Sequence, residues 1–229
     1  MLRRLIKASA VVVGVGLAVA ACSPVKMGAA AIVGNQRITI ATLDTEVTNL
    51  SQAAAQYPAS VSLTASQRTQ ATLTWLIRYQ IFEEMARQAG ITVSTAQGQK
   101  ALNQAVAMAE SAAEQQGLTN ATQTLILAAS GIPPNTSAEL GRYEAIASQY
   151  LIIANGGTAP AAGSAAQTAA GNKLNTAECQ AAKALNIAVN PQFGQLDYNG
   201  YQVVTAPSPV TRTQGPVKAA SPVATAPAC

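Results

Sequence analysis

The stretch TASQRTQATLTWLIRYQIFEEMARQAG, residues 64–90, decides the fold. Thr64 and Gln67 fit a capping box at its start, and Gly90 followed by Ile91 fits a left-handed cap at its end. Between these signals the apolar residues form two adjacent rows at helical spacing, Leu73, Leu76, Ile77 and Ile81 in one and Trp75, Tyr79 and Phe82 in the other. Because the rows together cover more than half of the circumference, the sequence predicts a central helix with neighbours on several sides.

The aromatic row has two interpretations. Aromatic rows at helical spacing usually pack in a core, and we favour this interpretation. In the other, Trp75, Tyr79, Phe82 and Met85 line an exposed groove that binds extended or partly folded polypeptide. Burial of the row would remove the residues on which the groove depends.

Similar signals surround the central helix. Capping residues predict helices that begin at Thr39, Ser94, Thr119 and Thr136 and end near Tyr57, Gly117, Gly131 and Asn155. A last helix is predicted from about Thr176 to Asn186. The Ala- and Gly-rich run 158–171 before it is typical of a flexible loop.

Strand signals lie at both ends of the helical region. AAIVGNQRIT, residues 30–39, predicts two short strands around Gly34-Asn35, and residues 187–204 predict a hairpin around Asn199-Gly200. We expect the N-terminal strands to pair with this hairpin. The resulting fold class is mainly α, a bundle of about five to six helices with a small β element, over residues 29–205. The Pro- and Ala-rich tail, 206–229, is expected to be disordered.

The N-terminus has the features of a targeting segment. Arg3, Arg4 and Lys7 precede 14 uncharged residues, 8–21, fewer than the roughly 20 that span a bilayer. A basic start, a short apolar run and small residues describe a secretory signal peptide. Residues 19–22, Val-Ala-Ala-Cys, resemble a bacterial lipobox, which implies removal of 1–21 and diacylglycerol on Cys22. The alternative is an ordinary signal peptide with an incidental Cys22.

Lipidation would place the mature chain on the extracytoplasmic face of the cell membrane, with 22–28 as a linker. Without the three basic residues of the signal peptide, 11 basic residues face 10 acidic ones, a net charge of about +1, and no electrostatic footprint for nucleic acid remains. Cys179 and Cys229 would then be the remaining cysteines, and we favour a disulfide between them over two free thiols.

The sequence offers no pattern for catalysis. It contains no histidine, and three isolated cysteines do not have metal-site spacing. Glu83 and Glu84 point in different directions on a helix, so we interpret them as a solvated edge rather than an acid–base pair. We therefore expect neither an enzyme nor a metal site, and no cofactor besides the lipid.

The order of these segments resembles the SurA N-terminal domain family. The matching residues are 33–39 and 76–94, with looser similarity in GIPPNTSAELGRYEAIASQYLI at 131–152 and VNPQFGQLD at 189–197. Coverage is roughly residues 29–198. The resemblance implies a helical, chaperone-like module that binds unfolded exported polypeptides as a foldase or holdase. Relatives often carry a parvulin prolyl isomerase domain of roughly a hundred residues, typically with active-site histidines. This sequence has neither that stretch of chain nor a histidine, so we expect no prolyl isomerase activity. The alternative function is a structural or adapter lipoprotein with one dedicated protein partner.

The lipid anchor gives a direct prediction. Cys22→Ser removes the sulfur that would carry diacylglycerol, so the protein should be released from the membrane fraction, as measured by fractionation and metabolic lipid labelling. Cys179→Ser is the matched control and should remain membrane-associated. Persistent, labelled membrane association of the Cys22→Ser variant would contradict the lipoprotein prediction.

Overall fold

The computed structural model describes residues 28–117 and 120–206. The predicted signal peptide, linker up to residue 27, tail from 207, Cys22 and Cys229 lie outside these residues. The helices are α1 (Ile40–Gln56), α2 (Ala65–Ala89), α3 (Thr95–Gln115), α4 (Gln123–Ala129), the short 3₁₀ helix η1 (Pro134–Thr136), α5 (Ser137–Ala154) and α6 (Ala165–Ala184). The strands are β1 (Ala29–Val33), β2 (Gln36–Thr39), β3 (Ala188–Val189), β4 (Gln195–Asp197) and β5 (Gln202–Val204). The expected fold class, mainly α with a small β element, is confirmed.

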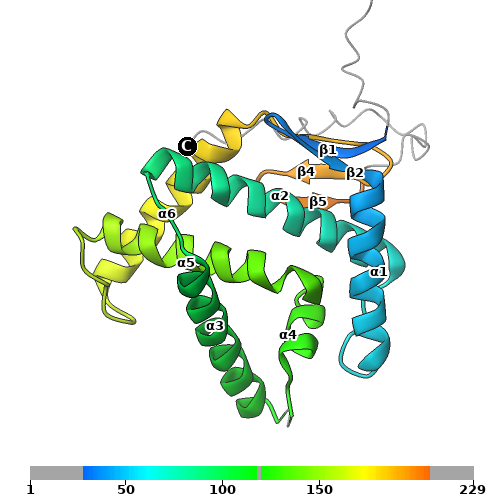
Figure 1. Ribbon diagram of the computed structural model, residues 1–229, viewed down its shortest axis with the longest axis horizontal. Coiled ribbons are helices and arrows are strands. Elements are labelled where there is room, and N and C mark those ends of the chain that lie inside the picture. Colours follow the sequence, from blue (N-terminus) through cyan, green and yellow to red (C-terminus); the bar gives the residue numbers. More distant parts are fainter. Residues whose placement is uncertain (1–27, 118–119, 207–229) are drawn as a thin grey trace, which may run out of the picture.

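Helix α2 lies at the centre, as its sequence predicts. The Thr64 hydroxyl accepts a hydrogen bond from the Gln67 amide, and Oε1 of Gln67 accepts one from the Thr64 amide, so the predicted capping box is present. Gly90 ends the helix in the left-handed conformation, with φ of 65°. Helices α1, α5 and α6 and strand β5 all contact α2, and Figure 1 shows it running between the strands and α5.

The aromatic row of α2 belongs to the core. The exposed fractions of Trp75, Phe82 and Met85 are 6%, 2% and 1%, and only Tyr79 of the four proposed groove residues is half-buried. The Phe82 ring lies 4.0 Å from that of Tyr143 on α5, between ring centroids. The exposed aromatic groove is therefore wrong and the core interpretation is confirmed, because α5 covers this row.

The indole of Trp75 also changes a predicted cap. Its Nε1 donates to the Thr136 hydroxyl at 2.9 Å, and that hydroxyl donates to the carbonyl oxygen of Pro133 at 2.8 Å. The Thr136 side chain consequently makes no capping bond to α5. The expected cap at Thr136 is wrong because the hydroxyl accepts a hydrogen bond from a buried indole instead.

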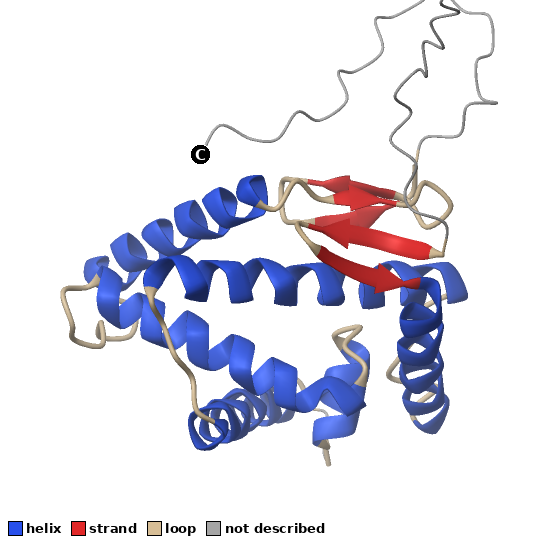
Figure 2. Cartoon of the chain, turned by 45° about the horizontal axis from the view of Figure 1, so that its top comes forward, coloured by secondary structure: helices blue, strands red, loops and turns tan. Residues whose placement is uncertain are grey.

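The strands form two small antiparallel sheets, which Figure 2 shows gathered at one side of the helices. In the first, β1 lies between β2 and β3; in the second, β4 pairs with β5. The expected pairing of the N-terminal strands with residues 187–204 is confirmed for the start of that segment, where β3 pairs with β1, and is wrong for the strands around Asn199-Gly200, because β4 and β5 form a sheet of their own. Strand β3 follows α6 directly and occupies the free edge of β1, with Ile32 opposite Ala188. The hairpin instead bonds to α2, where the Val203 amide donates to the Thr74 hydroxyl at 2.8 Å.

Helix α6 begins earlier than the sequence predicts. The hydroxyl of Ser164 accepts from the Gln167 amide at 3.1 Å and caps a helix that starts at Ala165 and ends at Ala184. The prediction of a flexible loop over 158–171 is therefore wrong for its second half. Alanine has the highest helix propensity, so an Ala-rich run with a good cap and a surface to pack on becomes helical.

Helices α3 and α5 approach each other at a pair of glycines. A Cβ at Gly141 would lie 2.5 Å from the carbonyl oxygen of Gly98, well inside contact distance. Gly171, within α6, has no atom within 4 Å of the position of its missing Cβ. The first glycine sets a helix crossing, whereas the second leaves room for a side chain.

These two glycines form a matched pair for measurement. Gly141→Ala should lower the free energy of unfolding by about 1–3 kcal/mol, because the helices must separate. Gly171→Ala should raise it by about 0.5–1 kcal/mol through helix propensity. Urea unfolding followed by circular dichroism measures both. Equal effects of the two substitutions would contradict the close α3–α5 approach.

Candidate functional site

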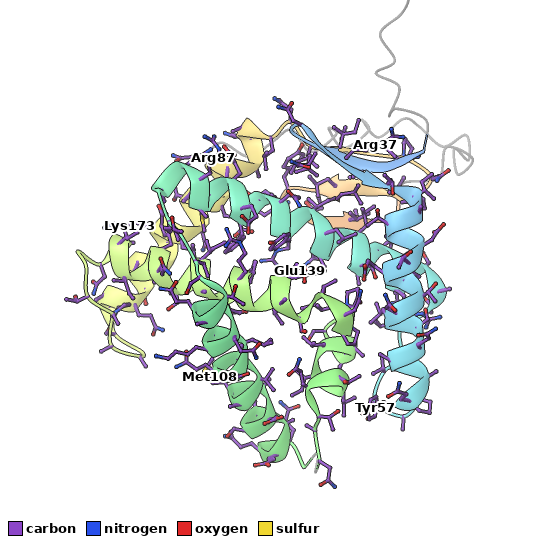
Figure 3. All side chains as sticks on the ribbon, in the orientation of Figure 1. Arg37, Tyr57, Arg87, Met108, Glu139 and Lys173 are labelled. Atoms are coloured by element: carbon purple, nitrogen blue, oxygen red, sulfur yellow. The ribbon has the colours of Figure 1, made fainter. Side chains whose placement is uncertain are left out.

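The described residues expose few large apolar side chains. Met108 on α3 is 70% exposed and Ile153 near the end of α5 is 54% exposed, and these are the exposed large hydrophobics of the described ranges. Figure 3 shows Met108 on α3, which projects away from the strands. Within residues 28–117 and 120–206, apolar exposure is thus limited to separate side chains rather than a broad patch.

The accessible edge of α2 is polar and contacts α5. Tyr79, Glu83 and Arg87 lie one helical turn apart on α2, and Arg142 of α5 joins them at Glu83. We call these four residues the polar strip. The Arg142 guanidinium donates to Glu83 through Nε and through Nη2, the latter at 2.9 Å, and Nη1 donates to the Val93 carbonyl oxygen at 3.0 Å. This fork fixes the orientation of both side chains.

The carboxylates of α2 have separate partners. Glu83 pairs with Arg142 between helices, whereas Glu84 accepts from Arg87 on its own helix, at 2.8 and 2.6 Å. The expectation of a purely solvated edge is therefore wrong for Glu83, because α5 brings an arginine to it. Hydrogen bonds from Arg87 lower the pKa of Glu84. The two carboxylates are thus ion-paired side chains, not an acid–base couple.

Charges in the polar strip are fixed at neutral pH. Burial, followed by the charge and hydrogen bond of Glu83, raises the pKa of Tyr79 to about 12. The hydrogen bond to Glu83 raises the pKa of Arg142 above its ordinary value. Tyr79 therefore stays a neutral phenol and Arg142 stays a cation, which suits recognition by hydrogen bonds and charge.

Two hollows flank the Glu83–Arg142 pair. The first, about 250 Å³, lies where α3 crosses α5: Tyr79 and Arg142 line it together with the apolar Val93 and Leu102, and Ser94, Gln99, Ser137 and Glu139 add polar groups. We call it the α3–α5 hollow. Figure 3 shows Glu139 near the start of α5 and Arg87 near the end of α2.

The second hollow, about 640 Å³, lies beside the β1–β2 turn, and we call it the turn hollow. Its lining combines the turn residues 33–36 with Gln80, Glu83, Glu84 and Arg87 of α2 and with Ala184 and Leu185 after α6. The Gly34 amide donates to the Leu185 carbonyl oxygen at 2.5 Å, and this bond holds the turn against the end of α6. The polar strip therefore runs between two concave surfaces formed by different elements.

The sequence located this site only in part. Of Trp75, Tyr79, Phe82 and Met85, the structure places Tyr79 on the polar strip and the other three in the core. Glu83 and Arg87 were within reach of sequence reasoning, since they follow Tyr79 at intervals of four residues. Arg142 was missed, because no local signal connects it with a helix 59 residues earlier.

Cys179 lies half-buried on α6 and is in a disulfide bond. Its predicted partner, Cys229, lies outside the described residues, so the pairing stays a prediction. In the described part of the chain, no group of three or more potential metal ligands comes together. Across the same residues, no helix combines the length and apolarity needed to cross a membrane.

Comparisons of the chain with models of protein families, with curated proteins and with solved structures found no match. The resemblance to the SurA N-terminal domain family therefore stays a prediction carried by the motifs alone.

A second charged cluster lies between α2, α5 and α6, with a buried carboxylate and a partly exposed arginine. Glu178 of α6 is 8% exposed, and its Oε1 lies 3.7 Å from Nη2 of Arg78, which also donates to the Tyr143 hydroxyl at 3.1 Å. Burial raises the pKa of Glu178 above 4.5, against the opposing charge of Arg78, and the pKa of Glu144 is raised for the same reason. Glu178 is therefore the buried member of this cluster, whereas the Arg78 side chain is 35% exposed and keeps contact with solvent.

The raised pKa of Glu178 predicts a pH-dependent stability. The folded state binds this proton more readily than the unfolded chain, so the free energy of unfolding should increase as the pH falls from neutral toward 4.5. That contribution is lost as the pH rises through the folded-state pKa. Glu178→Gln should flatten the dependence, as measured by urea unfolding between pH 7.5 and 4.5, whereas Glu114→Gln on the exposed part of α3 should not. An unchanged slope in the Glu178→Gln variant would contradict the assignment.

Proposed function

We propose that the chain is a lipid-anchored, non-catalytic adapter of the cell envelope, which binds an extended segment of one dedicated protein partner along the polar strip. The observation that carries this proposal is the Glu83–Arg142 pair, which is fixed between the α3–α5 hollow and the turn hollow. Fixed charges between concave surfaces favour one partner with complementary side chains.

The dimensions suit a short peptide. Tyr79 and Arg87 are eight residues apart on α2, about 12 Å along the helix axis, which corresponds to about four residues of extended chain. The α3–α5 hollow, at about 250 Å³, is smaller than most small-molecule sites, which run from about 300 to 1,000 Å³. A side chain of a bound segment would fill it, with the apolar Leu102 below and Ser94 and Gln99 at the rim.

Two observations favour an adapter over a general holdase. A holdase that captures many unfolded chains needs apolar surface, and the aromatic row that could have supplied it is buried. The polar strip instead offers a neutral phenol, a carboxylate and two guanidinium groups in set positions. The chaperone-like function implied by the family resemblance remains the competing hypothesis.

Site-specific crosslinking in cells tests the proposal. A photo-crosslinking residue at Gln99, at the rim of the α3–α5 hollow, should capture one dominant protein, and the same residue at Gln52, exposed on α1, should not. A smear of exported proteins at both positions would instead support the holdase and contradict the adapter.

A charge swap separates recognition from folding. Glu83→Arg combined with Arg142→Glu restores an ion pair between the helices but reverses its polarity, so the melting temperature should stay near that of the unmodified protein while the crosslink from Gln99 is lost. A retained crosslink in the swapped protein would show that the pair has only a structural role.

A further inference from the structure

A separate groove lies between α5 and α6, on surface that the polar strip does not use. Its volume is about 330 Å³, and Tyr150, Ile153 and Ala154 of α5 face Ala177 of α6 across it. Ile153 is 54% exposed, whereas Ala177 in the same lining is buried. The lining of this α5–α6 groove is predominantly apolar, and an apolar groove with a half-exposed isoleucine lacks a covering element.

The groove has a defined end and a defined side. At the end, Nζ of Lys173 donates to the Ala154 carbonyl oxygen at 2.8 Å and connects the two helices, and Figure 3 shows Lys173 at this end of the molecule. Along the side, α6 contributes Asn172, Thr176 and Gln180, with one helical turn between successive residues. Cys179, which is in a disulfide bond, lies on the same helix one residue before the groove residue Gln180 and three after Thr176.

The disulfide identifies a candidate occupant within the same chain. Besides Cys179, the sequence contains only Cys22 and Cys229. Cys22 is the predicted lipid attachment residue, which leaves Cys229 as the partner. The 23 residues from Pro207 to Cys229 can extend to about 75 Å, so the tail is long enough to reach any point on α6.

The chemistry of the tail matches the groove. Residues 207–229 contain five prolines and no acidic side chain, and the last nine, SPVATAPAC, carry no charged side chain. Such a segment favours the polyproline II conformation, which is preformed and docks in apolar grooves that contain aromatic side chains. From Asn172 to Gln180 the groove runs about 12 Å along α6, the length of about four residues in this conformation.

We propose that residues 224–228, ATAPA, lie in the α5–α6 groove and that a Cys179–Cys229 disulfide holds them there. Pro227 and the alanines beside it cover Ile153 and Tyr150. The tail thus acts as an intramolecular strap across α5 and α6, and the polar strip stays free.

The methyl NMR signal of Ile153 tests this proposal in the mature, oxidised protein, with the signal assigned through Ile153→Val. A variant that ends at Ala206 should shift the signal toward that of a solvent-exposed isoleucine. Pro227→Asp, which leaves both cysteines in place, should shift it in the same direction, because a carboxylate does not enter an apolar groove. Pro209→Asp, in the same tail but far from Cys229, is the matched control and should leave the signal unchanged.

Three outcomes would overturn the proposal. One is an Ile153 signal that is the same with and without the tail. Another is peptide mapping that finds Cys179 joined to Cys22, which would place a different segment at the groove. The third is a signal that changes on dilution but not on tail removal, which would assign the groove to a second copy of the chain.

Discussion

Burial of α2 on several sides is the constraint on which the rest of the structure depends. Leu73, Ile77 and Ile81 on one row and Phe82 and Met85 on the other are all within 2% of complete burial. Each such side chain contributes about 1.5–3 kcal/mol when it is removed from water, so the helix can only be stable with partners on both rows. Helices α1, α5 and α6 and strand β5 are those partners.

The same constraint defines the candidate site. Once the two apolar rows are covered, the residues that α2 presents to solvent are mainly polar, and Tyr79, Glu83 and Arg87 form the part of this surface that lies beside the two hollows. The Phe82–Tyr143 contact draws α5 against α2, and Arg142, the neighbour of Tyr143, is thereby brought to Glu83. The polar strip is therefore a consequence of how the core is packed, because Arg142, one of its two cations, is the chain neighbour of the core-packed Tyr143.

Local signals predicted the helices well, whereas contacts between elements were beyond them. The boxes at Thr64 and Ser94 were readable because each bond joins residues three apart. The start of α6 was missed because its Ala-rich sequence has the composition of a loop. In the structure, packing against α2 and α5 stabilises the helix. The hydrogen bond of the Thr136 hydroxyl could not be predicted locally, because its partner is Trp75, 61 residues away. Strand pairing was predicted only in part for the same reason, since the pairing of β3 with β1 joins residues far apart in the sequence, whereas β4 and β5 pair with each other.

A strap across α5 and α6 would change what the disulfide contributes to stability. A bond from Cys179 to Cys229 closes a loop of about 50 residues, and by chain entropy alone it disfavours the unfolded state by about 4 kcal/mol. If the tail stays loose in the folded protein, the disulfide also closes a flexible loop of 23 residues in that state. The entropic cost of closing this loop cancels all but about 0.7 kcal/mol of that gain. A tail docked in the groove is already ordered by its apolar contacts. The disulfide then costs the folded state little conformational entropy, so most of the roughly 4 kcal/mol is retained. In such a strap the covalent link and the docking surface would depend on each other: the bond would keep a short apolar segment near the groove, and the groove would make the bond effective in stabilising the fold.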